Sequence, residues 1–160
     1  MNTNEKLQNQ LISLILQGNA FMPLTNLLES IPLEITAKRI DNPVHTIWEL
    51  TEHIRIALYD LVAYSKDSYF QSPPWPDGYW PDHPEPQSSE EWGKSINQIN
   101  SLLNELTELI KDPSVNLYEP FKANPEHTLL RQITIVAEHN AYHTGQIAML
   151  KNLLQGRDQQ

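Results

Sequence analysis

Hydrophobic residues recur at helical spacing along most of this chain, and this pattern predicts four amphipathic helices. No segment shows the strict alternation of a half-buried strand. The expected helices run roughly from Thr3 to Glu29, from Pro43 to Lys66, from Ser88 to Ile110, and from Asn124 to Gly156. Because each presents one apolar face, the pattern predicts an all-α protein, a four-helix bundle.

Capping signals support three of the four predicted helix starts. Asparagine followed by proline at 42–43 and 124–125 has the composition of a helix cap and first helical position. Ser88 and Glu91 have the spacing of a capping box. Gly18 lies on the apolar face of the first helix. Glycine within a helix is less favourable than alanine by about 1 kcal/mol, so we expect Gly18 to permit close packing there.

The connection between the second and third helices, residues 67–87, is long and rich in proline and aromatic residues. It contains six of the twelve prolines, which exclude a helix, and its aromatic side chains argue against disorder. Such a segment could form a lid or wall over a pocket, or an ordered strap that covers the core. We favour the strap, and the two roles are compatible.

Length, net charge and cysteine content limit the class of protein to which this chain can belong. A chain of 160 residues with 39% hydrophobic residues fits one globular domain spanning 1–160. We expect no signal peptide and no membrane span, because the apolar runs are short and the start lacks basic residues. A net charge of −9 without a basic cluster argues against nucleic acid as a partner. The absence of cysteine excludes disulfides and thiolate ligands, and we expect a cytoplasmic protein.

The last predicted helix carries two histidines four residues apart, His139 and His143, in the run AEHNAYHTGQIAML. Residues at this spacing share a helix face, so both imidazoles can reach one metal ion. His143 lies within the apolar stripe of this helix, His139 lies at its edge, and Glu138 points away. The stripe is formed by Leu129, Ile133, Val136, Ile147, Leu150 and Leu154. Metal binding and hydrogen bonding to neighbouring groups or water both remain open for the pair.

A metal centre needs at least a third ligand, and His53 is the candidate. It lies on the flank of the second helix, about 90° from the centre of its apolar stripe, with Asp60 two turns further along the same edge. We expect His45, His83 and His127, near helix starts or in the proline-rich loop, to be solvated. Three imidazoles would leave a position for water or substrate, as in catalytic zinc sites; nickel, iron(II) and manganese are alternatives.

Four segments together resemble the DinB-like superfamily, which includes YfiT-type metalloenzymes. These segments are IWELTEHIRIAL, WPDGYWP, TLLRQI and AEHNAYHTGQIAMLKNLL. The resemblance spans most of the chain, and its most specific part is the H-x-x-x-H-x-G-Q run joined to an upstream histidine. It implies a four-helix bundle whose metal is held by His53, His139 and His143. It also implies homodimers, and enzymes that act as metal-dependent hydrolases or transfer small-molecule thiols.

The leading hypothesis is therefore a metal-dependent enzyme that acts on a small molecule, as a hydrolase or a thiol transferase. Asp60 and Gln146 are candidates for orienting the imidazoles, and no general base can be identified. The alternatives are a non-catalytic metal-binding module for stress response or small-molecule binding, and a bundle whose histidines are merely buried. Trp48 and Tyr59 face away from the apolar stripe of the second helix, where they would contact either a second subunit or the 67–87 loop.

Overall fold

The structure is a computed structural model that describes residues 3–41 and 45–157. Within these residues the chain is all-helical and has no strand, which confirms the predicted all-α class. Its helices are α1 (Thr3–Gln17), α2 (Leu24–Glu29), α3 (Leu33–Thr36), α4 (Ile47–Lys66), the 3-10 helix η1 (Asp77–Tyr79), α5 (Ser89–Lys111) and α6 (Leu129–Arg157).

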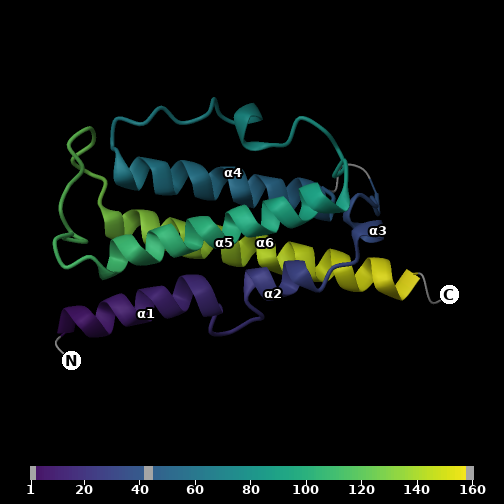
Figure 1. Cartoon of the computed structure of the whole chain (residues 1–160), viewed down its shortest axis with the longest axis horizontal. Coiled ribbons are helices and arrows are strands. Elements are labelled where there is room, and N and C mark those ends of the chain that lie inside the picture. The colour runs from purple at the N-terminus through teal and green to yellow at the C-terminus, as the bar shows by residue number, and fades with distance from the viewer. Residues whose placement is uncertain (1–2, 42–44, 158–160) are drawn as a thin grey trace.

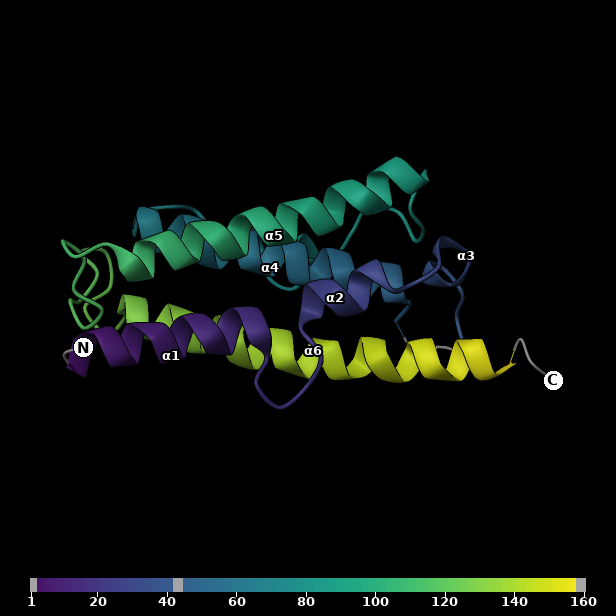
Figure 2. The ribbon, with the colours of Figure 1, turned by 60° about the horizontal axis from the view of Figure 1, so that its bottom comes forward.

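Helices α5 and α6 lie on opposite edges of the molecule (Figure 2). Helix α4 packs on both from one side, and α1 and α2 follow one another along the other side (Figures 1 and 2). Burial of one large apolar side chain contributes about 1.5–3 kcal/mol, so these contacts hold the helices together. The largest apolar side chains with almost no exposure are Trp48, Leu28, Ile47, Ile54, Leu58, Ile99, Leu106, Ile110, Ile133 and Ile147. Among the described helices, none is both long and apolar enough to cross a bilayer.

The predicted first helix, from Thr3 to Glu29, is wrong as a single element. Helix α1 ends at Gln17, and Gly18 follows in the left-handed region with φ +65°. A Cβ atom on Gly18 would approach the Phe21 ring to 2.8 Å. The glycine therefore makes a turn that stops the helix, instead of allowing close packing within it. The chain resumes as the shorter helices α2 and α3, each directly preceded by a proline.

Helix α4 begins at Ile47, later than predicted, and Thr46 is its cap. The Thr46 hydroxyl accepts from the Glu49 backbone N–H at 3.1 Å, and the Glu49 carboxylate accepts from the Thr46 N–H at 2.8 Å. This capping box satisfies two N–H groups that the helix itself leaves unpaired. The predicted cap at 42–43 lies outside the described residues.

The cap predicted for α5 is confirmed, and the one predicted for α6 is wrong. Ser88 accepts from the Glu91 backbone N–H at 3.1 Å. Asn124 instead closes a turn before α6 by accepting from the Glu126 N–H at 3.1 Å. The Thr128 hydroxyl accepts from the Arg131 N–H at 3.2 Å, so α6 begins at Leu129. The asparagine–proline pair therefore marks a turn and not a helix start.

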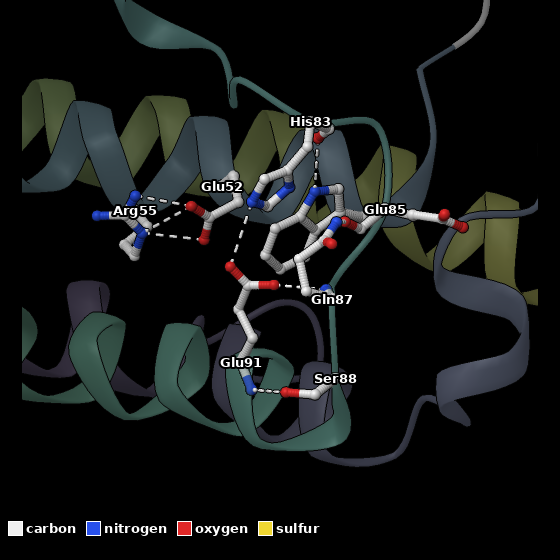
Figure 3. A network of polar contacts seen from close by, with 8 residues as sticks. Glu52, Arg55, His83, Glu85, Gln87, Ser88 and Glu91 are labelled. Atoms are coloured by element: carbon white, nitrogen blue, oxygen red, sulfur yellow. Dashed lines mark hydrogen bonds and ion pairs between the residues drawn. The ribbon is translucent and has the colours of Figure 1, made fainter.

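The 67–87 segment runs along the outer side of α4 (Figure 1). At one end of α4, the Trp48 indole N–H donates to the His83 carbonyl at 3.0 Å, and the two rings stack. Figure 3 shows this end of the segment, where His83 also lies 3.3 Å from the Glu91 carboxylate. Tyr59 contacts Phe70 edge to face, with ring centroids 5.9 Å apart. Trp48 and Tyr59 therefore both contact the loop of their own chain.

Candidate metal centre

Three histidines from α4 and α6 converge on one point. His53 is presented by α4, and His139 and His143 lie one turn apart on the facing side of α6. The Nε2 atoms of His53 and His139 are 3.0 Å apart, and one nitrogen from each ring lies within 4.8 Å of the others. The packing of α4 against α6 thus supplies the third imidazole that the helical pair lacks.

Burial keeps these imidazoles neutral. Only 5% of His53 and 8% of His143 is exposed, and His139 is half-buried. Burial lowers the pKa of all three, and the neighbouring His143 and His53 add to the effect at His139, whose pKa falls to about 4. A neutral imidazole offers a lone pair, so near pH 7 little competition from protons opposes metal binding.

Hydrogen bonds fix the orientation of two of the rings. The His53 Nδ1–H donates to the Tyr79 backbone carbonyl at 2.8 Å, and the His143 Nδ1–H donates to the Gln146 Oε1 at 2.6 Å. With the proton on Nδ1, the Nε2 atom of each ring is free to bind a cation. Such hydrogen bonds on the far nitrogen are a common feature of metal-binding histidines.

The two candidates for orienting the rings differ in how they act. Gln146 contacts His143 directly. Asp60 contacts none of the three imidazoles, and instead its Oδ2 accepts from the Tyr79 hydroxyl at 2.8 Å. Burial and this carboxylate raise the pKa of Tyr79 to about 12, which keeps the phenol protonated as a donor. Asp60 therefore acts on His53 indirectly, because it hydrogen-bonds the side chain of Tyr79, and the Tyr79 carbonyl orients His53.

Tyr79 and Trp80 are part of the site, and sequence reasoning did not single them out. The Trp80 indole stacks on His53, with centroids 4.2 Å apart and planes 11° apart, and also on His45, with centroids 4.0 Å apart. It covers one face of the His53 ring. The aromatic density of the 67–87 loop was a signal that this segment matters, but it did not indicate which residues reach the histidines.

The other three histidines lie apart from this cluster. His45 is exposed, as expected, apart from its stacking on Trp80. His83 and His127 are half-buried, so the expectation that they are solvated holds only in part. His83 stacks on Trp48, and His127 Nδ1 lies 3.0 Å from the Tyr64 hydroxyl. Contacts with the loops that pack on α4 account for both.

The donor set fits a divalent transition metal. Metal–nitrogen bonds of about 2.1 Å place neighbouring ligand nitrogens about 3.0–3.4 Å apart. The 3.0 Å between His53 and His139 lies in this range, and the third nitrogen lies within 4.8 Å of both. Three neutral nitrogens favour zinc, nickel, iron(II) or manganese over magnesium or calcium, which prefer oxygen. The three histidines can therefore hold a metal ion with at least one position left for water or substrate.

Fold and site together define an all-helical protein with a three-histidine cluster suited to a metal ion. A family model of the DinB superfamily matches residues 20–147, which include all three histidines, and the chain belongs to this family. The resemblance found in the sequence is thereby confirmed. Comparisons with curated proteins and with solved structures gave no significant match.

Proposed function

We propose that this protein is a metal-dependent enzyme that acts on a small molecule through a centre formed by His53, His139 and His143. The observation that carries the proposal is the convergence of three neutral imidazoles, two of them buried and anchored through Nδ1 and the third half-buried. We propose zinc as the ion, and a single four-helix bundle over residues 1–160 as the scaffold.

A divalent ion at this centre would supply Lewis-acid chemistry that makes water or a thiol nucleophilic near neutral pH. The residues of the chain have positioning roles. Tyr79 and Gln146 hold the rings of His53 and His143, and Trp80 keeps water from one face of His53. This support matters because small errors in ligand placement are costly to catalysis.

The metal content of protein purified without an affinity tag tests the centre. We expect about one ion per chain in the parent, and loss of the ion in His53→Ala, His139→Ala and His143→Ala. His127→Ala is the matched control, because His127 contacts Tyr64 and lies outside the cluster. Equal metal content in the parent and the three cluster variants would show that the site assignment is wrong.

Two reactions fit this centre, hydrolysis and thiol transfer. Mass spectrometry after incubation of the metal-loaded protein with an electrophile, with and without a low-molecular-weight thiol, separates them. An adduct indicates transfer, and water-cleaved products without a thiol indicate hydrolysis. Metal uptake without turnover over a broad substrate panel would favour the non-catalytic alternative, a stress-response or small-molecule-binding module.

We also propose a homodimer. Large apolar side chains are exposed on one face of α6, at Tyr142 (65%), Met149 (58%) and Leu153 (46%), and such a face is typical of a protein–protein contact. The net charge of −9 supports small molecules over nucleic acid as partners. Solution scattering tests the dimer, and a monomeric mass would contradict it.

A further inference from the structure

A cavity of about 350 Å³ lies between α4 and α6. Its lining includes Asp60, seven residues after His53 on α4, and Gln132, seven residues before His139 on α6. The two helices run in opposite directions (Figure 1), so both steps lead the same way along the molecule. Seven helical residues span about 10 Å, which places the cavity two turns from the histidines on the same interhelical face.

Two buried polar atoms in the lining of this cavity have no hydrogen-bond partner, Asp60 Oδ1 and Gln132 Nε2. The residues are only 8% and 1% exposed. A buried donor or acceptor without a hydrogen bond is unfavourable, so each atom favours a partner that the described chain does not supply. That partner must donate to the Asp60 carboxylate and accept from the Gln132 amide.

The charged groups of the lining narrow the chemistry of this partner. Arg131 is exposed at the cavity, and its guanidinium makes no ion pair with any carboxylate in the described chain. Burial and the nearby Arg131 lower the pKa of His127, so its imidazole is neutral near pH 7. One anion, Asp60, and one cation, Arg131, remain. The rest of the lining consists of Leu61, Tyr64, Ser72 and Ile135.

We propose that this cavity is a binding site for the ammonium and carboxylate groups of an α-amino acid, free or at the end of a larger compound. The ammonium group would donate to Asp60 Oδ1, and the carboxylate would accept from Gln132 Nε2 and Arg131. A zwitterion satisfies both buried atoms and both charges at once. A hydroxyl compound would form no charge-assisted contact with Arg131, and a simple anion would leave Asp60 Oδ1 without a donor.

The distance to the histidines indicates the role of the site. A compound whose amino-acid end occupies the cavity would have to extend about 10 Å past Tyr79, which hydrogen-bonds both His53 and Asp60, to reach the histidines. The cavity would then select substrates by a group remote from the reacting atoms. This role rests on the proposed function, whereas amino-acid binding itself does not require the metal.

Calorimetric titration tests the site. The probes are the common L-α-amino acids, each beside its N-acetyl derivative, which lacks the ammonium group, and its methyl ester, which lacks the carboxylate. The full-length proteins are the parent, Arg131→Gln, His139→Ala and Lys6→Gln. Lys6→Gln is the matched control, because this exposed lysine lies on α1 and removes the same charge.

We expect at least one amino acid to bind saturably and both derivatives to bind far more weakly. Arg131→Gln should weaken binding by about tenfold or more, the loss expected for one charge-assisted contact. Lys6→Gln and His139→Ala should bind like the parent. Failure of every amino acid to bind, equal binding of the N-acetyl derivatives, or no effect of Arg131→Gln would overturn the proposal. Loss of binding in His139→Ala would also overturn it, because it would indicate chelation at the metal.

Metal analysis of the same preparations keeps the two proposals apart. Amino-acid binding to a protein that takes up no metal would overturn the proposed function and leave this site standing. Metal uptake without amino-acid binding would overturn the amino-acid site and leave the proposed metal centre standing.

Discussion

His53 and Tyr79 are 26 residues apart in the chain, and the imidazole of the first donates to the backbone carbonyl of the second at 2.8 Å. The Tyr79 side chain turns back to α4, where its hydroxyl donates to Asp60. One residue of the 67–87 segment therefore contacts α4 at two points, two turns apart. This makes the segment a strap that orients a histidine of the candidate metal centre.

Tyr79→Phe should destabilise the protein. The variant keeps the carbonyl that His53 uses, but it removes the hydroxyl that donates to Asp60. A buried carboxylate oxygen left unpaired costs about 1–3 kcal/mol, and urea unfolding would measure the loss. The control is Tyr69→Phe, since Tyr69 is 64% exposed. Equal stability of the two variants would contradict a structural role for the Tyr79–Asp60 hydrogen bond.

Gln146→Leu should weaken zinc binding by about 10–100-fold, the usual effect of losing a hydrogen bond that orients a ligand. The His143 Nδ1–H would lose its acceptor, and the ring could rotate or change tautomer. Competition with a coloured chelator would measure the affinity. Gln146→Glu keeps an acceptor and should retain most of it, and Gln10→Leu on the exposed face of α1 should match the parent. Wild-type affinity in Gln146→Leu would rule out this positioning role.

Glu49→Gln should lower stability in a pH-dependent way. Burial raises the pKa of Glu49, but hydrogen bonds from the Thr46 backbone and Arg39 outweigh it, so the net pKa lies below the ordinary 4.5. The unfolded chain thus binds this proton more tightly, and the stabilisation is full above pH 4.5 and lost as the pH falls below it. We expect a loss of about 1 kcal/mol near neutral pH.

Denaturant unfolding of the parent and Glu49→Gln, near neutral pH and well below pH 4.5, would test this dependence. The difference between the two proteins should shrink in acid. A difference that stays constant over this range would show that the carboxylate charge contributes nothing to the cap.

Gly18→Ala and Gly93→Ala should have effects of opposite sign. At Gly18 the positive φ and the contact with Phe21 both oppose a Cβ atom, so we expect a loss of about 1–3 kcal/mol. At Gly93, within α5, a Cβ atom would meet nothing within 4 Å. Alanine should therefore stabilise the helix by up to about 1 kcal/mol. Thermal unfolding would measure both, and a stabilising Gly18→Ala would contradict the turn.

The local parts of this protein could be predicted from sequence, because they depend on residues close together in the chain. His139 and His143 share a face through helical periodicity alone, and Ser88 caps α5 through a contact three residues away. His53 required more, since its position on the flank of α4 was ambiguous until the family resemblance was added. The errors at Gly18 and Asn124 were also local, because a residue type allows more than one backbone conformation.

Contacts between distant segments could not be predicted. The acceptor for His53 is a backbone carbonyl, a group that every residue carries and that leaves no mark in the sequence. Trp80 was one of several aromatic residues in its loop, and only the course of the loop over α4 places it on His53. The same applies to the cavity, whose unpaired atoms on Asp60 and Gln132 come from two helices.

The sequence by itself thus determined the helical class, the histidine pair and the family, because periodicity and short motifs encode them. The tertiary structure decided which groups meet. It brought His53 to the pair, Tyr79 and Trp80 to His53, and Asp60 and Gln132 to one cavity. These contacts depend on the packing of α4 against α6 and of the 67–87 loop against α4. Such packing is set by the free energy of the whole chain and not by that of any one segment.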